Sequence, residues 1–102
     1  MSATVFEKQG SALTVRPAGR LDSTTSPLLE EELQQQLTGI QEITMDFTDV
    51  EYISSAGLRV LLATEQLMEN RGGSMKLMHV NEHILSIFDL VGFMDVVTVV
   101  QD

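Results

Sequence analysis

The sequence contains no cysteine, and only six of its 102 residues are lysine or arginine. Without cysteine the chain can form no disulfide, thiol nucleophile or thiolate zinc site. Fifteen aspartates and glutamates outnumber the basic residues and give a formal charge of -9. A surface of that sign repels phosphate backbones and anionic lipids, so we expect no direct nucleic-acid binding and a partner that is basic or apolar at the contact.

Long apolar runs are also missing. No segment approaches the ~20 apolar residues of a membrane span. The first ten residues, MSATVFEKQG, lack the basic stretch and apolar run of a signal peptide. We therefore expect no membrane insertion and a cytoplasmic location. Because 43% of the residues are hydrophobic and 21% are charged, the composition is that of an ordinary globular protein, and we expect one domain over residues 1–102.

Five segments have the composition or alternation of β-strands. Residues 4–7 and 13–16 are β-prone runs on either side of a turn, which predicts a hairpin. Residues 43–47 alternate apolar and polar side chains, and further strands are predicted at 75–79 and 96–100. The apolar residues just after 47 are expected in a loop.

Three helices are predicted between these strands. The first covers about 11 residues and has Pro27 at an early position, which suits a helix start. The second begins at Ser54 and ends at the glycine pair 72–73. The third follows Asn81, a candidate N-cap. The order ββαβαβαβ predicts an α/β fold with a mixed sheet of about four to five strands and helices packed mainly on one face.

No set of residues resembles an active site. Asp46, Asp49 and Glu51 are carboxylates on a strand and the following loop, where polar residues are common without any metal. His79 and His83 are four apart, but a strand end lies between them and breaks the spacing of a helical metal pair. No GxGxxG or Lys-Ser phosphate loop is present. We therefore expect no enzyme activity, metal or cofactor.

The most informative stretch is DVEYISSAGLRVLL, in which a strand leads into a helix that begins at two serines. The first turn of a helix has unpaired backbone N–H groups that serine can cap. Capping accounts for either Ser54 or Ser55, but not for both.

Helical periodicity divides the second helix into two faces. The core face is predicted to contain Val60, Leu61, Thr64, Leu67 and Met68. Leu58 and Leu62 project instead into the polar arc, on the same outer surface as Ser55 and Arg59. Two interpretations remain open: the leucines form a docking patch, or the preceding loop and a neighbouring helix cover them.

Four segments in order resemble a known family: AGRLD at 18–22, DFTDVEYISSAGLRVLL at 46–62, GGSMKLMHV at 72–80 and IFDLVGF at 87–93. The sequence is similar to STAS domains, and among them to the stand-alone bacterial anti-sigma factor antagonists. That resemblance implies a partner-switching cycle. The unphosphorylated antagonist binds an anti-sigma factor that is also a serine kinase, which releases the sigma factor. Phosphorylation ends the binding, and a serine phosphatase resets the cycle.

The resemblance also assigns residues. The phosphorylated position corresponds to Ser55, two residues before Gly57. Many relatives have aspartate immediately before the phosphorylated residue, whereas this chain has a second serine there, so Ser54 is the alternative acceptor. Asp22 is expected close to the phosphorylation site. The residues expected at the partner contact are Asp22, Ser54, Ala56, Gly57, Leu58, Arg59 and Leu62. The rival interpretations are a STAS subunit of a transporter or stress-sensing complex, and a nucleotide-binding domain.

Overall fold

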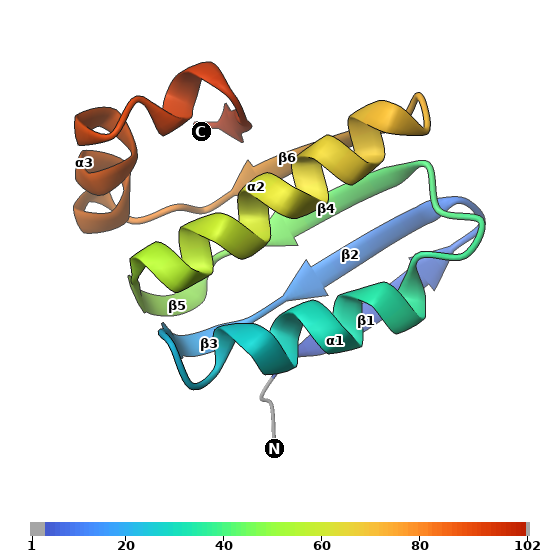
Figure 1. Ribbon diagram of the computed structural model, residues 1–102, viewed down its shortest axis with the longest axis horizontal. Helices are drawn as coiled ribbons and strands as arrows, with labels where there is room; N and C mark the ends of the chain where they lie inside the picture. Colours follow the sequence, from blue (N-terminus) through green and yellow to red (C-terminus); the bar gives the residue numbers. More distant parts are fainter. Residues whose placement is uncertain (1–3, 102) are drawn as a thin grey trace.

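The computed structural model describes residues 4–101, which fold into strands and helices around one hydrophobic core (Figure 1). The elements in chain order are β1 (Val5–Gln9), β2 (Ala12–Arg16), β3 (Ala18–Leu21), α1 (Ser26–Gln36), β4 (Glu42–Asp46), β5 (Asp49–Ile53), α2 (Ser55–Asn70), β6 (Ser74–Met78), α3 (Glu82–Leu90), the 3-10 helix η1 (Phe93–Asp95) and β7 (Thr98–Val100). No helix in this part of the chain is long and apolar enough to cross a membrane.

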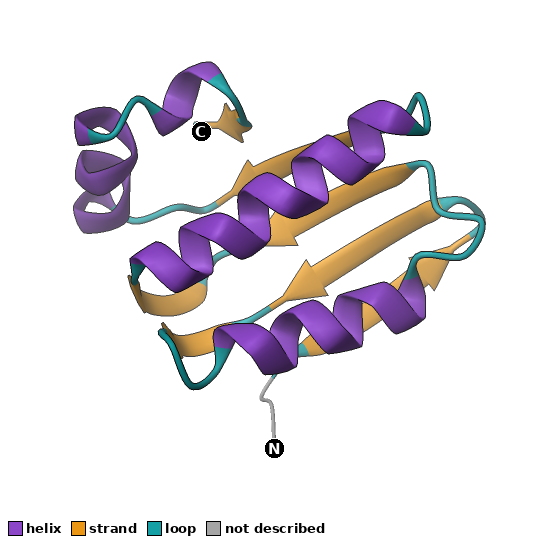
Figure 2. Ribbon diagram, viewed as in Figure 1, coloured by secondary structure: helices purple, strands orange, loops and turns teal. Residues whose placement is uncertain are grey.

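The main sheet has five strands in the order β1-β2-β4-β6-β7. The predicted hairpin is present, since β1 and β2 are antiparallel, and every later pair in this sheet is parallel. Parallel neighbours require crossover connections, and α1 and α2 provide two of them. Both helices lie across the same face of the sheet (Figure 2). The predicted mixed α/β fold, with helices mainly on one face, is therefore confirmed.

A second, two-stranded sheet was not predicted. β3 and β5 pair in parallel, so residues 49–53, expected in a loop, form a strand. The register shifts between Gly19 and Arg20, and the pairing ends with Leu21 opposite Ile53. Neither strand alternates strictly between buried and exposed residues, so its own pattern does not identify it. It is the pairing between two segments about 30 residues apart that makes them strands.

The core lies between the main sheet and the two long helices. Alternate residues of β2, β4 and β6 point toward the helices, as the period of a strand requires. The largest fully buried side chains are Phe47, Phe88, Leu13, Leu29, Leu33, Ile40, Ile43, Met45, Ile53, Leu61, Met68 and Leu77. Thr64 is also buried, and its hydroxyl donates to the carbonyl of Val60 at 2.7 Å.

One predicted core residue of α2 is wrong. Leu67 is 39% exposed, although Val60, Leu61, Thr64 and Met68 are buried as expected. It lines a small depression between α1 and α2, so the neighbouring helix does not cover it fully. Helical periodicity in the sequence does not show where the neighbouring helix lies, so it cannot predict which side of α2 that helix covers.

The helix boundaries agree closely with their predicted signals. Asn81 caps α3, its side chain accepting from the N–H of Ile84 at 2.9 Å and donating to the carbonyl of Val50 at 3.2 Å. Pro27 lies in the first turn of α1. β6 ends at Met78, so His79 is not part of the strand. Its φ of 59° turns the chain toward α3.

Candidate functional site

The β3–β5 pair brings two distant parts of the chain to one place. Leu21 lies opposite Ile53, and the N–H of Ser54 donates to the carbonyl of Leu21 at 2.8 Å. Asp22 and Ser54, the residues that directly follow the two strands, therefore lie close together. The predicted proximity of Asp22 to the paired serines follows from this register.

The two serines have different surroundings. Ser54 is the N-cap residue of α2 with an extended backbone, but its side chain makes no cap hydrogen bond. The Ser54 hydroxyl is buried and has no partner within residues 4–101. Ser55 is the first residue of α2 and is exposed to solvent. A modifying enzyme can therefore reach Ser55 directly, whereas the protein itself covers the hydroxyl of Ser54.

Gly57 allows α2 to start close to the small sheet. A Cβ at this position would lie 2.7 Å from Cγ1 of Ile53 and 2.9 Å from the carbonyl oxygen of Leu21. Both distances are shorter than van der Waals contact, and one of the two atoms belongs to the backbone. Gly57 is itself buried, so it supports the site by close packing and exposes no side chain to a partner.

Asp22 organises the turn between β3 and α1. Its Oδ1 accepts from the N–H groups of Thr24 at 3.0 Å and Thr25 at 3.1 Å. The hydrogen bonds from the backbone of Thr25 and Thr24 lower the pKa of Asp22, and nearby Arg20 contributes in the same direction. Arg20 Nε is 3.9 Å from Oδ2, and its guanidinium lies 4.3 Å from the ring centre of Tyr52. Asp22 thus supplies a fixed negative charge near the serines.

The leucines on the outer face of α2 are less exposed than helical geometry predicts. Leu58 and Leu62 are partly buried and pack against the core cluster, so the expectation that they project into the polar arc is only partly correct. Arg59 is exposed and Ala56 is partly exposed. The surface around Ser55 therefore combines one cation with the uncovered edges of the two leucines.

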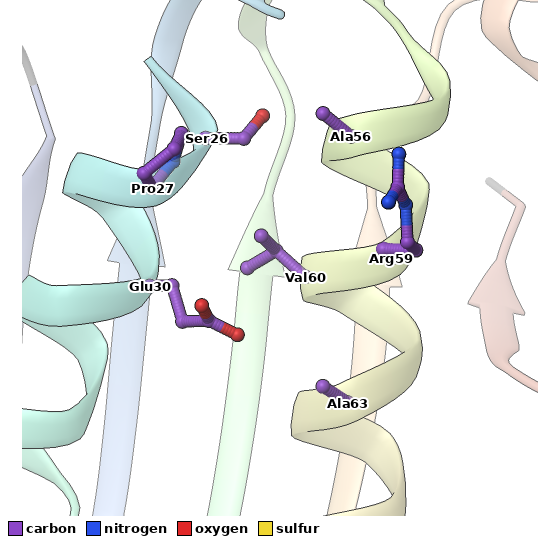
Figure 3. Close-up of a pocket in the computed structure, with 7 residues that line it drawn as sticks. All are labelled: Ser26, Pro27, Glu30, Ala56, Arg59, Val60 and Ala63. Carbon is purple, nitrogen blue, oxygen red and sulfur yellow. The ribbon is translucent and has the colours of Figure 1, made fainter. Parts of the chain in front are cut away.

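A groove of about 400 Å³ lies between the first turns of α1 and α2 (Figure 3). The residues that line it are Ser26, Pro27, Glu30, Ala56, Arg59, Val60 and Ala63. Five of these are absent from the predicted site: Ser26, Pro27 and Glu30 on α1, and Val60 and Ala63 on α2. No local pattern marks them, because the groove exists only once the two helices are packed side by side.

Of the three carboxylates Asp46, Asp49 and Glu51, Asp46 has a structural role. Asp46 accepts from Arg16 Nε at 3.3 Å and is 2.9 Å from Nδ1 of His79. It also binds the hydroxyl and N–H of Thr48. Asp49, Glu51 and His83 are exposed. In the described part of the chain, no three His, Asp or Glu side chains are arranged to hold a metal ion.

This combination of fold and strand-to-helix junction matches a known domain type. The profile of the STAS domain matches residues 3–102. The chain belongs to the STAS family. The anti-sigma-B factor antagonist of Bacillus subtilis strain 168 is 30% identical over 100 residues, which cover 97% of this STAS chain and 92% of the relative.

Solved STAS structures agree with the architecture described above. The anti-sigma factor antagonist SpoIIAA in its unphosphorylated form superposes with a TM-score of 0.78 at 14% identity, and the match covers 98% of this chain and 89% of that one. The Bacillus cell fate determinant SpoIIAA in the phosphorylated form gives a TM-score of 0.75 at 16% identity, with coverages of 98% and 93%. Identities this low show a shared fold and nothing further.

Proposed function

We propose that this STAS protein is an anti-sigma factor antagonist controlled by phosphorylation of Ser55. Its unphosphorylated form binds an anti-sigma factor that is also a serine kinase, and this binding releases the sigma factor. The observation that carries the proposal is the 30% identity to the anti-sigma-B factor antagonist of B. subtilis over 97% of the chain. The exposed position of Ser55 at the start of α2 supports it.

Phosphorylation of Ser55 is compatible with the folded domain. Phosphate adds about -1.5 to -2 charges at neutral pH. At Ser55 these charges would lie at the positive end of the α2 dipole, beside unpaired N–H groups of the first turn, and one turn before Arg59. On Ser54 the phosphate would have to enter a buried position. Ser55 is therefore the better acceptor of the two.

The same phosphate would oppose partner binding. A contact that covers Ser55 would include Ala56, Arg59 and the uncovered edges of Leu58 and Leu62. Burying a doubly charged group at such a surface costs several kcal/mol unless a cation meets it. In this proposal charge at the contact, and not unfolding, ends the binding.

The protein itself carries out no chemistry in this cycle. The kinase transfers phosphate from ATP to Ser55, and a serine phosphatase removes it. Both reactions are proposed to occur in the cytoplasm, where ATP is available. The STAS protein is a regulatory binding protein and a substrate.

Phosphate mapping with the partner kinase tests this proposal. Affinity capture from the native cell identifies the kinase, and mass spectrometry then maps the phosphate after incubation of both purified proteins with ATP. We expect one phosphate on Ser55, unchanged transfer to Ser54→Ala and none to Ser55→Ala. Stoichiometric phosphate on Ser54, or on Ser55→Ala, would contradict the assignment.

A further inference from the structure

The groove between α1 and α2 contains two polar groups that have no partner. Ser26 is 1% exposed, and its hydroxyl makes no hydrogen bond within residues 4–101. Glu30 lines the same groove, and no ion pair or hydrogen bond of its carboxylate occurs with any described residue. Figure 3 shows both side chains directed toward the space between the helices.

The remaining walls are mostly apolar. Pro27 belongs to α1, and Ala56, Val60 and Ala63 belong to α2. Arg59 is also at the groove, but its side chain runs along α2 toward Ala56, away from the Glu30 carboxylate (Figure 3). Arg59, the basic residue that lines the groove, therefore does not pair with the carboxylate of Glu30.

We propose that this groove binds a lysine or arginine side chain of the protein partner. A carboxylate only accepts hydrogen bonds, and a serine oxygen accepts them as well, so an occupant that satisfies both must be a donor. Lysine and arginine have three and five N–H donors, on stems whose methylene groups fit an apolar wall. The Ser26 hydroxyl, directed toward the space between the helices, is an acceptor for that cation (Figure 3).

Charge selects a cationic occupant over an anionic one. The chain has a formal charge of -9, which attracts basic surfaces at long range. An anion in the groove could pair with Arg59, but the carboxylate of Glu30 would then lie beside a second negative charge. The proposal rests on the proposed function only for the identity of the partner, which is then the kinase, and the groove can be tested without it.

The first test uses a small probe on the protein alone. Amide NMR spectra of the uniformly ¹⁵N-labelled chain are recorded during titration with n-butylguanidinium chloride, and with 1-butanol and sodium butyrate at the same ionic strength. We expect saturable shifts at Ala56, Val60 and Ala63 with the guanidinium alone, at a Kd of roughly 1–10 mM. Equal shifts with butanol, stronger shifts with butyrate, or no shift at about 50 mM guanidinium would overturn the proposal.

A matched pair of variants identifies the carboxylate that acts. Glu30→Gln removes the charge that faces the groove, while Glu31→Gln makes the same change at the next position, which is exposed and outside the groove. We expect Glu30→Gln to weaken the probe at least about fivefold and Glu31→Gln less than about twofold. Equal effects would show that net charge, and not the groove, attracts the cation.

Ser26→Ala separates binding from folding. Because the hydroxyl is buried without a partner, its removal should leave the melting temperature unchanged or raise it. It should nevertheless weaken the guanidinium probe. A lower melting temperature with unchanged probe affinity would mean that the hydroxyl serves the fold and not an occupant.

The second test uses the captured kinase. Glu30→Gln should weaken the complex about tenfold, and Glu31→Gln should not, while phosphate transfer to Ser55 is measured separately. If Ser55 is phosphorylated and Glu30→Gln binds as the parent does, the groove proposal fails and the switch stands. If the guanidinium occupies the groove but Ser55 receives no phosphate, the switch fails and the groove stands.

Discussion

Ser55 occupies an exposed position at the start of α2, where we expect a change of charge to leave the fold intact. Ser55→Ala loses at most a weak helix-start contribution of about 1 kcal/mol, so it should fold, bind the kinase as the parent does and receive no phosphate. Ser55→Asp places a negative charge where the α2 dipole favours it, and should fold normally while binding at least about tenfold more weakly. Calorimetric titration of both variants measures this. Parent-like affinity of Ser55→Asp would refute release by charge.

Gly57 has little room for a side chain. Gly57→Ala should lose about 1–3 kcal/mol of unfolding free energy, because the new Cβ must displace Ile53 and the backbone of Leu21. Gly57→Val should lose more. Denaturant titration measures both, and Gln66→Val, a β-branched change at an exposed position of the same helix, should cost only about 0.5 kcal/mol. If the Gly57 variants lose no more unfolding free energy than Gln66→Val, α2 must shift to accommodate the new side chain at little energetic cost.

Single residues of the site were predictable to different extents. The family resemblance singles out Ser55 and Asp22, and their roles stay predictions. The buried state of the Ser54 hydroxyl could not be predicted, because no local sequence pattern distinguishes it from the exposed Ser55. Ser26 and Glu30 lie on a different helix from Ser55 and acquire a shared surface only in the tertiary structure.

At the scale of elements, α2 has a fully buried face and a partly buried one. Leu61 is 0% exposed, so Leu61→Ala should cost about 2–5 kcal/mol through lost contacts and a cavity. Leu62 is partly buried, so Leu62→Ala should cost clearly less, about 1 kcal/mol, and should also weaken kinase binding. Denaturant unfolding and calorimetry measure the two effects. Equal losses of stability with unchanged binding would show that Leu62 is purely a core residue.

The sequence predicted the helices and the strands of the main sheet better than the two strands of the small sheet. α1, α2 and α3 have apolar periodicity and end signals within the element itself, such as Asn81 and the glycines after α2. β3 has four residues and β5 five, and their identity as strands depends on each other. At Leu67 the helical pattern was misleading. The pattern places this residue on the core face, whereas in the structure it is exposed and lines a depression between α1 and α2.

At the scale of the whole molecule, Asp46 joins three strands through one side chain. It contacts Arg16 at the end of β2 and His79 just after β6. Burial acts to raise the pKa of Asp46, but hydrogen bonds from Thr48 and His79 outweigh it and hold the pKa well below the ordinary 3.8. The ionised form is therefore the one that stabilises the fold.

The sign of the pH dependence follows. A carboxylate whose folded pKa is depressed contributes stability that is fully present above its ordinary value of 3.8 and is lost as the pH falls below that value. Asp46→Asn should lower stability at pH 7 and flatten the decline of stability between about pH 4 and pH 2. Urea unfolding at a series of pH values measures this, with Asp49→Asn, at an exposed position, as the control. An unchanged acid decline in Asp46→Asn would assign it to other carboxylates.

The strand order β1-β2-β4-β6-β7 has a consequence for the protein's synthesis. Across the main sheet, the strands stand in the order in which the ribosome releases them. Each emerging strand finds its neighbour already outside the exit tunnel, and none has to be inserted between two strands that are already paired. Chains emerge at about 5–20 residues per second, which is slow enough for each unit to pair before the next appears. The sheet can therefore grow at a single edge during translation.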